Sequence, residues 1–131
     1  YPRTNRMNTT SRPRPPLPAA GWRELLLWIL RRRTRLRVTG DSMRPTLAPG
    51  DVVLVDPRAF RHGRIPAWDD IVVARHPQQP DLEIIKRVAI VEADGQCLLL
   101  SDNPAAGTDS RQFGTVPVSA LRGRVMSKIE D

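Results

Sequence analysis

The stretch EIIKRVAIVEADGQCLLL, residues 83–100, decides the fold class of this 131-residue chain. It holds two apolar runs, residues 83–91 and 97–100, and the pair Asp94-Gly95 between them is a typical hairpin signal. Apolar side chains fall on both faces of the first run, so we expect its strand to be substantially buried. The stretch therefore predicts a β-hairpin with a buried first strand.

Short apolar runs continue this pattern on both sides of the hairpin. The further expected strands cover residues 36–38, 52–55, 71–74 and 124–129. Turns at Pro49-Gly50-Asp51 and at Pro77–Pro80 separate them, and the chain holds 13 prolines, about twice the usual share of ~5%. Six short strands without a long helix indicate a small all-β domain, which we place at residues 35–131.

The N-terminal part has a different composition. Residues 1–20 contain five prolines and four arginines, and we expect a disordered tail there. Residues 21–33, GWRELLLWILRRR, open a short basic amphipathic helix that we extend to residue 34. This apolar run is too short to cross a membrane. The helix either packs on the domain, the interpretation we favour, or makes a weak peripheral contact with a membrane.

The net charge of +7 belongs to this leader. Residues 1–37 contain ten arginines and one acidic residue, whereas residues 38–131 contain eleven basic and thirteen acidic residues. We therefore expect no nucleic-acid partner for the β domain. A single cysteine, Cys97, excludes a disulfide framework and a thiolate metal cluster within one chain, and we expect no metal site.

Lys86 is the first candidate for chemistry. Only two of the 21 basic residues are lysines, Lys86 and Lys128. Strand alternation places Ile84, Val88 and Ile90 on the face of Lys86, and Ile85, Ala89 and Val91 on the opposite face. Burial disfavours an ammonium group, so Lys86 can become a neutral general base. The alternative is a lysine that reaches solvent from a strand edge.

Ser42 is the second candidate. It lies in the loop GDSMRPTL, residues 40–47, where a serine in a glycine-flanked turn can present its hydroxyl and its backbone N–H. An ordinary polar loop is the alternative. The histidines, His62 and His76, are expected to be solvated surface residues and not bases. The residues thus point to a serine–lysine dyad.

Three segments occur in a fixed order: GDSMRPTLAPGD (40–51), IIKRV (84–88) and SDNPAAGTDSRQFGTVP (101–117), followed by GRV (123–125). In this order they resemble the boxes of the type I signal peptidase family, the serine–lysine endopeptidases. The resemblance covers about residues 36–129 and implies the coiled, barrel-like β domain of the signal peptidase and LexA type. Within the family, the compact chain resembles the maturation proteases of nickel-type superoxide dismutase.

The resemblance implies that Ser42 is the nucleophile, Lys86 the general base and the Ser42 backbone N–H an oxyanion donor. The loop residues expected to position the oxyanion and the substrate are Gly40, Asp41, Met43 and Pro45. Gly40 stands where some members carry a serine that supplies a second oxyanion donor, so this chain lacks that hydroxyl.

The third segment is expected to support the site. Its supporting residues are Asp102, Asn103, Asp109, Ser110 and Arg111, and an Asp109–Arg111 pair is expected to brace the active-site strand and loop. The family commonly reads Gly-Asp-Asn followed by a serine that orients the lysine. This chain has Ser101 in place of that glycine and Gly107 in place of that serine, with Thr108 as the candidate replacement hydroxyl.

The resemblance implies a serine endopeptidase that removes the N-terminal leader of a precursor protein, specifically nickel superoxide dismutase, without a cofactor. We expect a cytoplasmic location, with peripheral membrane contact through residues 21–33 as the alternative. Two other functions stay open: a type I signal peptidase acting on exported proteins at the membrane, and a non-catalytic peptide-binding β module. A self-cleaving repressor is not expected, because the residues before the β domain are too few for a DNA-binding domain.

Overall fold

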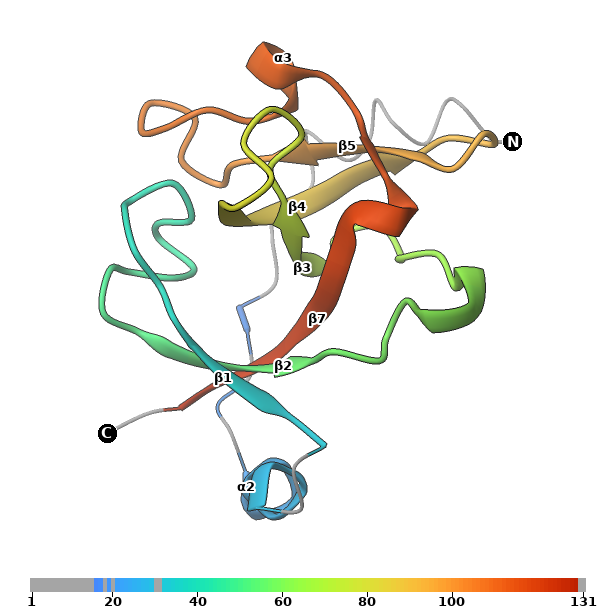
Figure 1. The fold of residues 1–131 in the computed structure, drawn as a ribbon. Coiled ribbons are helices and arrows are strands. Elements are labelled where there is room, and N and C mark those ends of the chain that lie inside the picture. The colour runs from blue at the N-terminus through green and yellow to red at the C-terminus, as the bar shows by residue number, and fades with distance from the viewer. Residues whose placement is uncertain (1–15, 18, 20, 30–31, 130–131) are drawn as a thin grey trace.

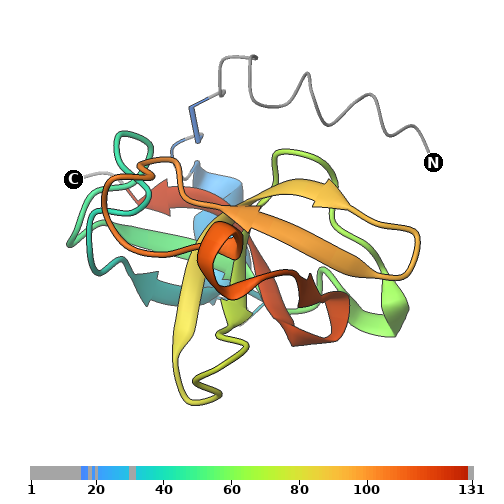
Figure 2. The ribbon, with the colours of Figure 1, turned by 90° about the horizontal axis from the view of Figure 1, so that it is seen from above.

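A computed structural model describes residues 16–17, 19, 21–29 and 32–129. In this part of the chain, seven antiparallel strands form one curled sheet in the order β1-β2-β7-β3-β4-β5-β6 (Figures 1 and 2). The strands are β1 (Thr34–Arg37), β2 (Val52–Asp56), β3 (Ile71–Arg75), β4 (Glu83–Val91), β5 (Gln96–Leu100), β6 (Val116–Pro117) and β7 (Leu121–Ile129). The helices are α2 (Trp22–Ile29) and α3 (Ser110–Phe113), with 3-10 turns η1 (Arg61–Gly63) and η2 (Val118–Ala120). The expected all-β class is confirmed.

The six expected strands all form, with shifts at their ends. The first begins at Thr34 and not at Leu36, and the last begins at Leu121, three residues before the expected start. The sequence analysis missed β6 and α3, which are only two and four residues long. Elements of this length are too short to show a hydrophobic period.

The hairpin of β4 and β5 forms as predicted, but its register contains a bulge. Val88 lies opposite Leu99 and Ile90 lies opposite Leu98, so Ala89 is an extra residue on β4. Beyond the bulge the two faces exchange. Val91, and not Ile90, therefore packs with Val88 in the core, and the expected alternation is wrong from residue 90 onward.

Two clusters of buried side chains form the core. The first cluster contains Ala59, Phe60, Val72, Ala74, Val88, Cys97, Leu99, Val116 and Leu121. The second cluster contains Val38, Met43, Leu47, Val53, Val55, Ile71, Val73 and Val125. Residues of β3 alternate between the two clusters, so this central strand is buried on both faces. The loop that carries Ser42 is thus built on the second cluster.

Helix α2 lies at the end of the molecule opposite α3 (Figure 1). Two described contacts join it to the domain: Glu24 accepts a hydrogen bond from Arg33 (3.0 Å), which approaches Asp56 at 3.9 Å, and the guanidinium of Arg35 on β1 lies 5.3 Å from the centroid of the Trp28 ring. Trp22 and Leu26 are exposed on its surface. Among the described residues, no helix has the length and apolar content needed to cross a membrane.

The expected tail, residues 1–20, lies largely outside the described residues. Of the described part, Leu17 packs against the second cluster. Ala19 forms an isolated parallel bridge with Lys128 of β7. The chain therefore contacts the domain before α2 begins.

Gly123 is the glycine with the least space for a side chain, and its replacement provides a test of the fold. A Cβ atom at Gly123 would lie 2.6 Å from Cγ1 of Val55 and 2.7 Å from the carbonyl oxygen of Asp56. Because backbone must shift to admit a methyl group, we expect Gly123→Ala to lower the free energy of unfolding by about 1–3 kcal/mol. Urea titration followed by circular dichroism measures this change.

Gly21→Ala is the matched control, because nothing lies within 4 Å of the added Cβ atom there. We expect its stability to stay within about 0.5 kcal/mol of the wild type. Equal stability of the two variants would contradict the packing of β7 against β2.

Candidate active site

Ser42 lies in a loop that two buried side chains anchor. The loop runs from Val38 to Asp51 between β1 and β2, and hydrogen bonds of 2.7 and 2.8 Å from Val38 N–H to Asp51 and from Gly50 N–H to Val38 close it. Met43 and Leu47 are fully buried in the second cluster, and Leu47 N–H donates to the Met43 carbonyl (2.9 Å). Ser42 itself is half-buried. The Ser42 hydroxyl therefore lies next to buried side chains that hold the loop on the core.

The residues expected to position the oxyanion and the substrate divide into two groups. Gly40, Asp41 and Pro45 are exposed beside Ser42, and Asp41 forms a surface ion pair with Arg44. The Met43 side chain instead points into the core, with 1% of its surface exposed. As a side chain, Met43 anchors the loop and is not available to a substrate.

Lys86 is buried as expected, with 4% of its surface exposed. It lies on β4 opposite Val72 of β3, and its Nζ donates a hydrogen bond to Oγ of Ser101 at 3.0 Å. Removal from water lowers the pKa of Lys86 from 10.5, and the negative charge of Asp109 partly opposes this shift. The alternative of a lysine that reaches solvent from a strand edge is wrong, because β4 lies between β3 and β5.

The segment 101–109 links Ser42 to Lys86. The Asn103 backbone N–H donates to the Ser42 carbonyl (2.8 Å), and the Asn103 side chain donates to the Asp41 carbonyl (3.1 Å). A Cβ atom built on Gly107 would lie 3.4 Å from Cβ of Ser42. Ser101, at the start of the same segment, holds Lys86. The structure thus brings both predicted dyad residues to one short stretch of chain.

Asp109 fixes the position of Ser101. The Ser101 N–H donates to the Asp109 carboxylate (2.8 Å), and the guanidinium of Arg111 donates to it at 2.6 and 3.1 Å. Burial alone would raise the pKa of Asp109, but the hydrogen bonds from Arg111 and Ser101 lower it to about 2. The expected Asp109–Arg111 pair therefore exists, and it holds the end of β5.

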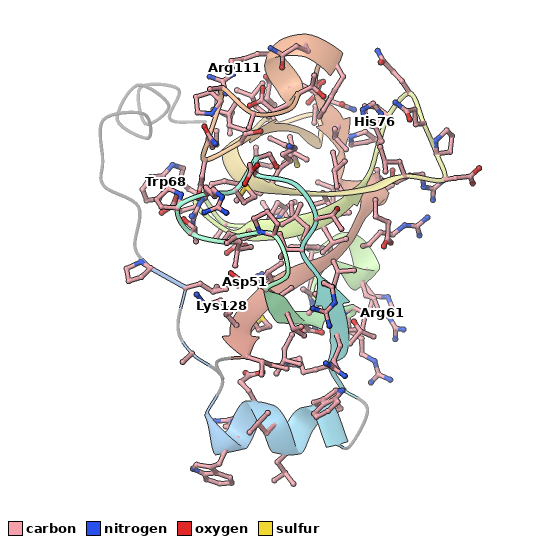
Figure 3. All side chains as sticks on the ribbon, turned by 90° about the vertical axis from the view of Figure 1, so that its left-hand side faces the viewer. Asp51, Arg61, Trp68, His76, Arg111 and Lys128 are labelled. Carbon is pink, nitrogen blue, oxygen red and sulfur yellow. The ribbon has the colours of Figure 1, made fainter. Side chains whose placement is uncertain are left out.

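Two neighbours of this pair have different surroundings. The Ser110 hydroxyl accepts a hydrogen bond from the Leu99 N–H (2.8 Å) and joins α3 to β5. Thr108, the expected replacement for the lysine-orienting hydroxyl, is exposed. The hydroxyl that contacts Lys86 belongs to Ser101, so the expectation for Thr108 is wrong. Arg111 is a residue of α3 and lies toward the other end of the molecule from Lys128 and Asp51 (Figure 3).

A buried ion pair that the sequence analysis missed connects all three segments. Arg87 follows Lys86 on β4 and donates to the Asp102 carboxylate at 2.6 and 3.1 Å, with both side chains at most 4% exposed. The Arg87 guanidinium also donates to Oγ1 of Thr46 (3.3 Å), whose hydroxyl donates to Asp102 (2.7 Å). Asp102 was expected to support the site, but its partners were not identified. The sequence did contain a signal for this pair, because a charged residue such as Arg87 in a strand buried on both faces requires a partner.

The histidines take structural or exposed positions. His62 is exposed in η1, as expected. His76, expected at the surface, is buried with 6% exposed: its Nδ1 accepts a hydrogen bond from the Gln78 N–H (3.1 Å), and its ring lies 4.9 Å from that of Phe113. In Figure 3 it lies on the side of the molecule opposite Trp68. These contacts tie His76 to the β3–β4 turn and to α3.

Two other chemically active groups lie outside this arrangement. Lys128 is partly exposed and approaches Asp51 at 3.9 Å (Figure 3). Cys97 is buried in the first cluster, and burial raises the pKa of its thiol to about 11. In the part of the chain that the structure describes, no three histidine, cysteine or acidic side chains are grouped as metal ligands.

Comparisons with known proteins identify relatives of this chain. It is 34% identical over 110 residues to mitochondrial inner membrane protease subunit 1 of Xenopus tropicalis, which covers 70% of this chain and 65% of the frog protein. It is 33% identical over 110 residues to the human subunit 1, covering 70% and 66% of the two chains. It is 32% identical over 114 residues to mitochondrial ATP-independent inner membrane protease subunit 1a of Arabidopsis thaliana, covering 70% and 67%. The chain thus spans about 65% of the length of the first of these relatives.

A family model matches residues 27–118, a range that runs from α2 to η2. This range contains the loop of Ser42, the strand of Lys86 and the segment 101–109 that joins them. The expectation of a protease related to the signal peptidases is supported at this level, whereas the nickel superoxide dismutase subgroup stays a prediction. The chain belongs to the Peptidase S24-like family.

Proposed function

We propose that this chain is a serine endopeptidase in which Ser42 is the nucleophile and Lys86 the general base. One observation carries the proposal: buried Lys86 is held at 3.0 Å by Ser101, within the segment that also holds the loop of Ser42. The protease names of the relatives support the class of reaction. A non-catalytic peptide-binding module would not need a buried lysine, since an apolar residue there would avoid the cost of desolvation.

In the first half of the reaction, Oγ of Ser42 attacks the peptide carbonyl and the lone pair of neutral Lys86 accepts its proton. The backbone N–H of Ser42 donates a hydrogen bond to the oxyanion that forms. When the tetrahedral intermediate collapses, the carbon–nitrogen bond breaks and Lys86 gives the proton to the leaving amine. An ester between Ser42 and the acyl part of the substrate remains.

In the second half, a water molecule attacks this ester while Lys86 accepts a proton from the water. The carbon–oxygen bond to Ser42 breaks, and the proton returns from Lys86 to Oγ of Ser42. The products are a carboxylic acid and the free enzyme. This scheme needs no metal or organic cofactor.

The substrate that we propose is the N-terminal leader of a precursor protein, and the precursor of nickel superoxide dismutase is the specific candidate. The resemblance of the three segments supports removal of a leader peptide, and the nickel enzyme is carried over from the subgroup that the chain resembles. Signal peptides of exported proteins are the second candidate, favoured by the membrane-protease names of the relatives. Incubating the purified chain with each precursor and sequencing the new amino terminus by mass spectrometry distinguishes them.

We propose a cytoplasmic enzyme in which α2 packs on the domain, as the contacts of Glu24 with Arg33 and of Trp28 with Arg35 support, and weak peripheral membrane contact through α2 is the alternative. The exposed Trp22 and Leu26, next to the exposed Arg23, support such a contact. At physiological salt the protein should stay in the supernatant, whereas sedimentation with anionic vesicles that high salt reverses would favour the membrane contact. Equal sedimentation of a Trp22→Ser, Leu26→Ser variant would contradict it.

The dyad predicts a non-additive loss of activity. Ser42→Ala and Lys86→Met should each reduce kcat/KM by at least ~10⁴-fold, and the double variant should be no worse, because the two residues act as one unit. Cleavage of a labelled precursor in single-turnover experiments measures these rates. Substantial turnover by Ser42→Ala would contradict the proposed function.

Exchange of lysine for arginine provides a matched control. Lys86→Arg should be inactive, because a guanidinium keeps its proton and cannot act as a base. Lys128→Arg should retain wild-type activity, because the ion pair with Asp51 at the surface tolerates either cation. Activity in Lys86→Arg would exclude Lys86 as the base.

The pH dependence follows from the lowered pKa of Lys86. Only the neutral amine accepts a proton, so kcat/KM should rise with pH through a pKa below 10.5 and should be lost as acid protonates the lysine. A pH–rate profile of the wild type measures this rise, the acid limb of the profile, and His62→Ala should leave it unchanged. A limb that disappears in His62→Ala would assign the titration to the histidine.

The same shift has a cost in stability. As pH falls below 10.5, the unfolded chain takes up a proton on Lys86 before the folded chain does, so the stability of the fold decreases until the folded pKa is passed. Lys86→Met lacks this penalty and should unfold at the same or a higher temperature than the wild type at neutral pH. Thermal unfolding across this pH range tests the expectation, and a lower melting temperature of the variant at every pH would contradict it.

A further inference from the structure

We infer that Ser101 is the residue that positions Lys86 for proton transfer. This inference rests on the proposed function and adds to it the residue that orients the general base. The starting observation is the 3.0 Å hydrogen bond from Nζ of Lys86 to Oγ of Ser101, which joins side chains with 4% and 7% of their surfaces exposed. A buried, flexible lysine becomes an efficient base only when its amine is held in one place.

The backbone sets Ser101 in the required place. The last residue pair between β4 and β5 joins Arg87 to Leu100, so the next position along the two chains brings Ser101 opposite Lys86. Side chains at opposed positions of antiparallel strands lie on the same face. The Ser101 N–H is in turn bound to the buried Asp109 carboxylate at 2.8 Å. The hydroxyl is therefore held through its own backbone and does not depend on a flexible loop.

The position at which the resembling family carries its lysine-orienting serine cannot supply a hydroxyl here. Gly107 has φ of +90°, a conformation that side chains rarely adopt, and its added Cβ atom would lie 3.4 Å from Cβ of Ser42. A serine at residue 107 would have a strained backbone conformation, and its Cβ atom would be in van der Waals contact with Ser42. This chain thus carries the hydroxyl at residue 101, opposite Lys86, and a glycine at residue 107. The glycine leaves space beside Ser42.

The hydrogen bond has a chemical consequence for the amine. Neutral Lys86 uses one N–H to bind Oγ of Ser101, and this restricts the lone pair to the other two positions on Nζ. When Lys86 takes the proton from Ser42, the same oxygen continues to accept a hydrogen bond from the ammonium group. Ser101 exchanges no proton with the substrate, so it is a positioning residue.

Removal of the hydroxyl tests this assignment. Ser101→Ala should reduce kcat by about 10–100-fold with little change in KM, because the amine is displaced while the substrate contacts remain. The ammonium form also loses an acceptor, so the acid limb of the pH–rate profile should move to lower pH. Ser101→Gly, which also lacks the hydroxyl, should show the same two changes, and Ser101→Thr should restore both the rate and the limb.

Ser127→Ala is the matched control. Ser127 of β7 is also a buried serine, and its hydroxyl has no hydrogen-bond partner among the described residues. This variant should keep the wild-type kcat and pH limb. A purely structural role for Ser101 would lower the melting temperature and leave the limb in place.

The outcomes separate this inference from the proposed function. Wild-type kcat and an unmoved limb in both Ser101→Ala and Ser101→Gly, with Ser42→Ala inactive, would overturn the role of Ser101 and leave the dyad intact. Activity in Ser42→Ala would overturn the dyad itself. Recovery of Ser101→Ala by Gly107→Ser would overturn the argument that strain excludes a hydroxyl from residue 107.

Discussion

The buried ion pair between Arg87 and Asp102 is the interaction on which the candidate site depends. It joins β4 to the segment 101–109, and Thr46 extends it to the loop of Ser42. Loss of Arg87 would leave the Asp102 carboxylate as an unpaired charge in the interior, which typically costs about 3–5 kcal/mol. Loss of Asp102 would leave Arg87 with Asp69, whose carboxylate lies 3.9 Å from the guanidinium. Two hydrogen bonds from Asn103 to the same loop also join the segment 101–109 to Ser42 and Asp41.

Two adjacent cationic residues of β4 illustrate how one strand serves two purposes. Arg87 keeps its charge under all conditions and is matched with a carboxylate. Lys86 points to the opposite face, where its nearest polar contact is a hydroxyl and where burial lowers its pKa. One strand thus carries an arginine that supports the loop of Ser42 and a buried lysine that the proposed mechanism uses as the base.

Much of this arrangement could be predicted from the sequence. The hairpin, the all-β class and the burial of Lys86 follow from local patterns within 83–100. The bulge at Ala89 could not be predicted, because a register shift depends on the partner strand. Asp102 was expected to support the site, whereas Arg87 and Ser101 gained their roles only from contacts between distant segments. Ser101 was visible as a departure from the family pattern, but its orientation toward Lys86 requires the pairing of β4 with β5.

The place of β7 in the sheet has a consequence for folding during translation. This strand lies between β2 and β3, so it joins the half that carries Ser42 to the half that carries Lys86. On the ribosome, residues 121–129 are made after both halves have been synthesised. A nascent chain that lacks β7 therefore carries Ser42 and Lys86 on two separate pieces of the sheet. Under the proposed function, Ser42 and Lys86 come to lie on one continuous sheet only when β7 pairs with both β2 and β3.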